Sequence, residues 1–183
     1  MTSKQCKYCG NPLNLLRKDA KFCSQKCGTY FRRKSPKFPR VLTSRPRWVR
    51  WRSVKRGDRM TKVPLMPSGK NASTTDESTW RAYSTANTSS AGDGLGFVLN
   101  GDGISCIDLD DVILDGELDP RAKKLLAEVE PFYVEVSPSG NGIHAWVREP
   151  SPLGHPVFVR GDGLKVEWYS SGRYMTMTGN VFQ

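Results

Sequence analysis

Residues 132–148, F-Y-V-E-V-S-P-S-G-N-G-I-H-A-W-V-R, hold two strand-like runs joined by a glycine-rich turn at 139–142. Runs of β-branched and aromatic residues on both sides of such a turn predict a β-hairpin. The turn glycines let backbone amides and the hydroxyls of Ser137 and Ser139 approach a phosphate, with His144 beside it. A lone histidine on a strand is more often packed or solvent-facing, so the hairpin alone does not decide the function.

Similar short runs lie on both sides of this hairpin. They predict strands at residues 48–53, 61–65, 94–100, 104–110, 165–170 and 173–178. The turn sequences at 100–103 and 171–172 are expected to pair their flanking strands into further hairpins.

Two helices are expected between the strands. One should follow Thr75 or Asp76 and include Trp80, Tyr83 and Ala86. The other should begin at Pro120, with Asp119 as its N-cap, and end before Pro131. Strand-rich hairpins with intervening helices indicate the α+β class.

Acidic residues mark the stretch 103–111, G-I-S-C-I-D-L-D-D. The period of two along a strand puts Asp108 and Asp110 on one face, with Asp111 on the other. Paired carboxylates of this kind suit a divalent cation such as Mg²⁺ or Mn²⁺, although a solvated acidic loop is the other interpretation. Glu167 lies in an apolar run and is a candidate third ligand, while the forked guanidinium of Arg173 suits phosphate oxygens.

The net charge of +10 is unevenly distributed along the 183 residues. Residues 1–60 hold 18 Lys and Arg against two acids, whereas residues 61–183 hold 10 against 16. A basic N-terminal region with interleaved aromatic residues favours a nucleic-acid partner over a solubilising tail. No apolar run reaches the length of a membrane span and no signal peptide is evident, so we expect a soluble cytoplasmic protein that does not bind membranes.

Four of the five cysteines, Cys6, Cys9, Cys23 and Cys27, lie within the first 27 residues. Two closely spaced thiolate pairs predict a structural tetrahedral Zn²⁺ site, with Cys106 outside it. Ser24 is expected to cap a short helix that carries Cys27 and continues through residues 30–34. The stretches C-K-Y-C-G-N-P-L and F-C-S-Q-K-C resemble treble-clef zinc fingers. We therefore expect a zinc module at 1–34, a basic proline-rich linker at 35–46 and a catalytic domain at 47–183.

Three motifs together resemble the archaeo-eukaryotic primase superfamily, in its phage and plasmid primase-polymerase branch. They are D-L-D at 108–110, S-P-S-G-N-G-I-H at 137–144, and V-E-W-Y-S-S-G-R-Y-M-T-M-T-G at 166–179. The upstream stretches at 48–52, 61–65 and 71–80 look similar to that branch as well. The resemblance implies an RRM-like core, with Asp108, Asp110 and Glu167 as catalytic ligands of Mg²⁺ or Mn²⁺. It also places Ser139, His144 and Arg173 at the incoming nucleotide, joined by Ser137 and Lys62.

These observations predict a DNA primase/polymerase, a nucleotidyltransferase that copies single-stranded DNA from nucleoside triphosphates, with a separate helicase as a further expected partner. If the protein is phage-encoded, it would act in the host cytoplasm. One alternative is a non-catalytic zinc-finger DNA-binding replication protein with a degenerate core, against which the intact acids count. A rolling-circle nicking protein ranks third, because His144 and His155 lack the paired-histidine spacing of its metal site.

Overall fold

The computed structural model describes residues 4–6, 9, 11–13, 17, 19–28 and 37–182 of the chain. The chain divides into two compact units, Met1–Arg40 and Val41–Gln183. In the first unit, Gln5 forms an isolated antiparallel bridge with Pro12, and residues 25–28 are helical. The backbone N–H of Cys27 donates to Ser24 Oγ at 3.1 Å, as expected of the predicted cap. The predicted continuation of this helix through 30–34 lies outside the described residues.

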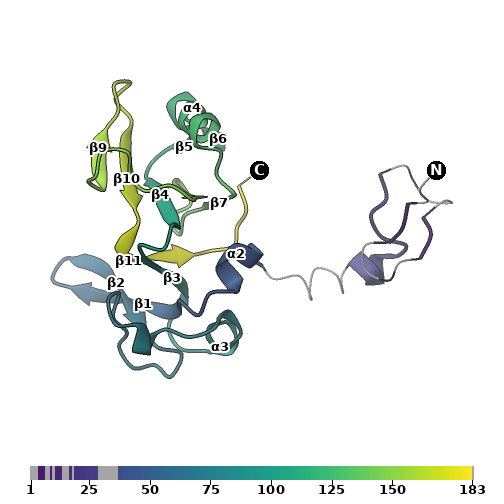
Figure 1. The fold of residues 1–183 in the computed structure, drawn as a ribbon, viewed down its shortest axis with the longest axis horizontal. Coiled ribbons are helices and arrows are strands. Elements are labelled where there is room, and N and C mark those ends of the chain that lie inside the picture. The colour runs from purple at the N-terminus through teal and green to yellow at the C-terminus, as the bar shows by residue number, and fades with distance from the viewer. Residues whose placement is uncertain are drawn as a thin grey trace. The chain divides into compact units, whose positions relative to one another are not determined.

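The second unit is built on two sheets in which every strand pairing is antiparallel (Figure 1). The four-stranded sheet has the order β11(Ser171–Met177), β3(Gly94–Asn100), β1(Trp48–Arg56), β2(Arg59–Leu65). The five-stranded sheet has the order β7(Tyr133–Val136), β8(Ile143–Val147), β4(Ser105–Leu109), β10(Lys165–Tyr169), β9(Val157–Val159). A two-residue pair, β5(Ile113–Leu114) and β6(Glu117–Leu118), precedes the long helix. The α+β class is confirmed, while the RRM-like arrangement stays a prediction.

The connections between strands differ from the predicted hairpins at two of three turns. The turn at 139–142 does join the paired strands β7 and β8. The turn at 100–103, however, leads from β3 in one sheet to β4 in the other, and β10 passes into β11 in the same way. These two turns were wrongly expected to close hairpins, because turn chemistry does not report which sheet the next strand enters. The chain thereby crosses twice between the sheets and holds them together.

The first predicted helix is two short helices instead of one. A 3₁₀ turn, η1, covers Glu77–Thr79 with Asp76 as its N-cap, and α3 covers Tyr83–Thr88. Between them Trp80 is extended and buried against Val49 and Val98. Its indole N–H donates to the Ser73 carbonyl at 2.6 Å, so the tertiary anchor of this ring overrides the helical pattern.

The predicted linker also contains regular structure. Helix α2 covers Arg40–Thr43, and its Leu42 is fully buried. The Leu42 carbonyl accepts a hydrogen bond from the Trp48 indole at 3.2 Å. The end of the segment expected to be an irregular linker therefore packs as part of the second unit.

Helix α4 (Pro120–Val129) begins as predicted, with the Asp119 side chain accepting from the Arg121 N–H at 2.8 Å. Its Ala122 and Leu125 pack in a core with residues 107, 109, 143, 145, 166 and 168 of the five-stranded sheet. The alternate positions of these strands, 108, 144 and 167, therefore occupy the opposite face. No helix in the described part of the chain is long and apolar enough to cross a membrane.

Candidate active site

A row of polar residues crosses the five-stranded sheet on the face opposite α4. In the strand register Asp108 lies opposite His144 on one side and opposite Glu167 on the other. His144 in turn lies opposite Glu135 of β7. Residues directly opposite one another on antiparallel strands share a face at close range. The side chains therefore form one row across the sheet, in the order Glu135, His144, Asp108 and Glu167.

Asp108 has a buried carboxylate oxygen without a hydrogen-bond donor. Its Oδ1 is buried and has no hydrogen-bond partner, and His144 Nε2 lies 3.5 Å away. Burial raises the pKa of Asp108, His144 opposes the shift, and the charges of Asp110 and Glu167 add to it. A buried carboxylate oxygen that lacks a donor is a suitable ligand for a cation.

The second ring nitrogen of His144 faces Glu135, at 3.4 Å between Nδ1 and Oε1. The Glu135 side chain is fully buried, and it also accepts from the Tyr133 hydroxyl at 2.9 Å. Backbone N–H groups of Thr178 and Gly179, just after β11, donate to it at 3.2 and 2.7 Å. Sequence reasoning missed Glu135. The available signal was its position, two residues before Ser137 and so on the same strand face.

The β7–β8 turn packs directly against the end of β4. A Cβ atom on Gly142 would lie 2.6 Å from the Leu109 carbonyl oxygen, so only glycine fits there. This close approach brings the turn beside Asp110, which is exposed just after β4. Ser137 Oγ and Ser139 Oγ lie 2.9 Å apart, so the two hydroxyls form one polar edge.

Glu167 lies in the row but its carboxylate is already bonded. It accepts from Lys165 Nζ at 2.7 Å and from the Tyr169 hydroxyl at 2.6 Å. Burial would raise its pKa, but these two bonds together with the nearby Arg173 charge lower it overall. Arg173 itself stacks on the Tyr169 ring, with 4.0 Å from Cζ to the ring centroid.

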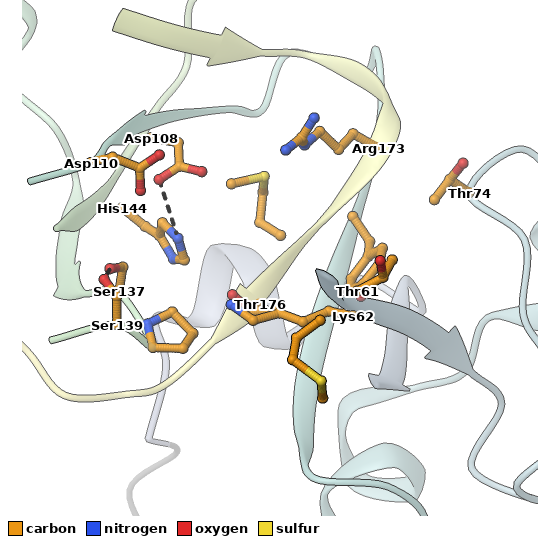
Figure 2. Close-up of a pocket in the computed structure, with 14 residues that line it drawn as sticks. Thr61, Lys62, Thr74, Asp108, Asp110, Ser137, Ser139, His144, Arg173 and Thr176 are labelled. Carbon is orange, nitrogen blue, oxygen red and sulfur yellow. Dashed lines mark hydrogen bonds and ion pairs between the residues drawn. The ribbon is translucent and has the colours of Figure 1, made fainter. Parts of the chain in front are cut away.

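A cleft of about 560 Å³ lies between the two sheets. Figure 2 shows Asp108, Asp110 and His144 on one wall and Arg173 on the other, with Lys62 and the two serines lower in the cleft. The residues that line it are Met60, Thr61, Lys62, Thr74, Asp108, Asp110, Ser137, Pro138, Ser139, His144, Arg173, Tyr174, Met175 and Thr176. Seven of the eight candidate site residues of this unit therefore line one cleft, and Glu167 does not.

The donor set of this cleft fits a divalent cation in part. Asp108 and Asp110 offer hard oxygen ligands toward the same space (Figure 2). Glu167 would have to exchange its bonds to Lys165 and Tyr169 for a metal. Within the described ranges, these three carboxylates do not come as close together as the cysteine ligands do.

The four N-terminal cysteines form a compact cluster. The Sγ atoms of Cys6, Cys9, Cys23 and Cys27 all lie within 4.8 Å of one another. The separations from Cys9 to Cys23 and from Cys23 to Cys27 are both 3.5 Å. Four thiolates at about 2.3 Å from a tetrahedral Zn²⁺ are about 3.8 Å apart, so the cluster is consistent with a zinc finger. The fifth cysteine, Cys106, is buried within β4, where burial raises its pKa.

These features define an α+β protein whose cleft combines carboxylates with basic and hydroxyl side chains. The chain is 38% identical over 152 residues to the DNA primase-polymerase of Nitratiruptor phage NrS-1. The aligned region covers 78% of this chain but only 20% of that relative, so the chain spans about one fifth of the length of the relative. No family model matches the sequence.

Proposed function

We propose that the chain is a nucleotidyl-transfer module of the phage primase-polymerase family, acting on single-stranded DNA and nucleoside triphosphates. The observation that carries the proposal is the convergence of Asp108, Asp110, His144 and Arg173 on one cleft. The 38% identity to a phage DNA primase-polymerase supports a primase or polymerase function. The zinc module and a separate helicase partner belong to the same proposal.

In this proposal the two walls of the cleft divide the work. Asp108 and Asp110, joined by Glu167 after it releases Lys165, would hold Mg²⁺ or Mn²⁺. When bound there, such a metal would supply activation of a 3′-hydroxyl and charge neutralisation of a triphosphate. Arg173 from the opposite wall, with His144, would bind the triphosphate, while Ser137, Ser139 and Lys62 provide further donors. Phosphoryl transfer needs mainly positioning and charge neutralisation, which these side chains supply without a covalent nucleophile.

The N-terminal cluster has a separate role in the proposal. Cys6, Cys9, Cys23 and Cys27 would hold one structural Zn²⁺, because four thiolates leave no open ligand position for chemistry. The basic charge of this region would help to bind the template.

The test is nucleotide incorporation on a single-stranded template by the purified full chain, with and without an annealed primer. Asp108→Asn should abolish incorporation while retaining the fold, because it removes the ligand charge but keeps the shape of the side chain. Asp111→Asn is the matched control, since Asp111 carries the same charge nearby yet does not line the cleft. Asparagine also tolerates the left-handed backbone of this position (φ 54°).

Two outcomes would overturn the assignment. Substantial incorporation by Asp108→Asn would remove this residue from the metal site. Binding of single-stranded DNA by the wild-type protein without any incorporation, under both Mg²⁺ and Mn²⁺, would instead favour the non-catalytic replication protein.

A further inference from the structure

The β1–β2 hairpin extends beyond the strand that it pairs with in the four-stranded sheet. Strand β3 pairs with β1 only from Trp48 to Trp51, whereas β1 and β2 pair with each other over Arg50–Arg56 and Arg59–Leu65. Figure 1 shows this distal part of β1 and β2 as a two-stranded projection. We call residues 52–62 the basic ribbon.

The basic ribbon carries an uncompensated positive charge. Five exposed cations lie along it, Arg52, Lys55, Arg56, Arg59 and Lys62. The only acid in the ribbon is Asp58 at its turn, and Asp93 approaches from outside, accepting from the Ser53 N–H at 2.6 Å. Across the described residues, none of the five cations forms an ion pair.

These charges oppose the folding of the ribbon itself. Arg56 lies directly opposite Arg59 in the register, and like charges in that arrangement destabilise a strand pair. An isolated two-stranded hairpin is at best marginally stable in water, so it gains little from packing to offset the repulsion. A polyanion lying along the ribbon would remove this repulsion, because each phosphate neutralises a cation.

The position of the ribbon indicates which polyanion it meets. Its Met60, Thr61 and Lys62 line the cleft that contains Asp108 and Arg173. In the register Thr61 lies opposite Val54, on the same ribbon face as Arg52, Arg56 and Arg59. A nucleic-acid strand that passes Thr61 in the cleft can therefore continue along these three cations. At about 3.3 Å per residue, the arm from residue 52 to residue 56 spans about 13 Å, enough for a few nucleotides rather than a single triphosphate.

We propose that the basic ribbon binds the phosphate backbone of the single-stranded template as it leaves the cleft. The inference rests on the proposed function for the identity of the strand. It assigns template binding to a defined element of the second unit, in addition to the charge of the N-terminal module.

The experiment measures binding of the full chain to a fluorescent oligothymidylate by anisotropy at several salt concentrations, without divalent metal or nucleotide. The ribbon variant carries Arg52→Gln, Arg56→Gln and Arg59→Gln. The control variant carries Arg121→Gln, Lys123→Gln and Lys124→Gln on α4, which removes the same charge from another exposed surface. Circular dichroism and urea unfolding establish that both variants are folded.

We expect the ribbon variant to bind more weakly, with a dependence of log K on log salt that is shallower by about 2. The value follows from about 0.7 per phosphate contact on a single strand. The control should retain the wild-type slope. Equal slopes in wild type and ribbon variant, equal losses in both variants, or no binding by the wild type would each overturn the proposal. So would a loss confined to duplex DNA of matched length.

The result is independent of the proposed chemistry, because no reaction occurs in the binding assay. A ribbon-dependent affinity in a protein that incorporates no nucleotide would reject the function and retain the ribbon. Normal incorporation together with unchanged DNA binding by the ribbon variant would reject the ribbon proposal and retain the proposed function.

Discussion

Replacing Glu135 should show how far one buried carboxylate supports the candidate site. Its two oxygens accept from three donors, namely the Tyr133 hydroxyl and the Thr178 and Gly179 N–H groups, and His144 Nδ1 lies 3.4 Å from Oε1. If the carboxylate accepts from His144 as well, the proton of that hydrogen bond lies on Nδ1. In Glu135→Gln, the amide NH₂ replaces one of the two carboxylate oxygens. In either orientation it faces a backbone N–H group, that of Thr178 or Gly179, and two donors then face each other.

The magnitude follows from that conflict. Leaving a buried donor unsatisfied costs about 1–3 kcal/mol, which we expect as the loss in unfolding free energy for Glu135→Gln. Glu135→Ala also opens a cavity and removes the carboxylate that faces His144, and should cost about 2–5 kcal/mol. For a chain of this size each kcal/mol corresponds to a decrease in melting temperature of about 2–4 °C.

Urea unfolding at pH 7, followed by tryptophan fluorescence and circular dichroism, measures these losses. The chain has only two histidines, so ¹⁵N-histidine labelling reports the protonated nitrogen of His144 directly. Tyr133→Phe is the control, since it removes one donor from Glu135 and should leave the imidazole signals unchanged. Wild-type stability and unchanged His144 signals in Glu135→Gln would refute the reasoning.

Three further predictions concern charge and metal. Burial raises the pKa of Asp108, so ionisation of this side chain lowers the free energy of unfolding as the pH rises above about 3.8. Asp108→Asn should therefore raise the free energy of unfolding at pH 7 but not near pH 3. Urea titrations at the two pH values measure this difference. Hydrogen bonds from Arg121 lower the pKa of Asp119 to about 2. The ionised side chain therefore stabilises the protein fully above about pH 3.8, and this contribution is lost as the pH falls toward 2. Asp119→Asn should weaken the decrease of unfolding free energy over this pH range, as measured by urea unfolding. Colorimetric zinc assays should find one Zn²⁺ per chain, lost in Cys9→Ser and retained in Cys106→Ser.

Alternation and turn chemistry were enough to locate most elements from the sequence. The strands β1, β2, β3, β4, β7, β8, β10 and β11 and the helix α4 lie where their patterns predict. The short strand β9 was missed, because its three residues, V-F-V, are too few to show alternation. The helix expected across Trp80 was wrong, since the buried indole and its bond to Ser73 depend on contacts that local propensity does not contain.

The candidate site was harder to predict than its motifs. Asp108, His144 and Arg173 stand out by residue type, but their meeting depends on register across strands that are distant in sequence. The pairing of Glu167 with Lys165 and Tyr169 was also unexpected. All three alternate on one face of β10, so the signal was present in the period of two, yet it was masked by the expectation of a metal ligand.

Glu135 also explains why the stretch after Arg173 belongs to the site although none of its side chains is a candidate ligand. The segment from Thr178 to Phe182 runs beside β7, with the Val136 N–H donating to the Asn180 carbonyl at 2.8 Å. The Glu135 carboxylate adds to this contact, because it accepts hydrogen bonds from the N–H groups of Thr178 and Gly179. Because the same carboxylate faces His144, it joins the wall that carries His144 to the end of the strand that carries Arg173. A buried acid that does not line the cleft thus contacts residues of both walls, and a change there should alter both walls together.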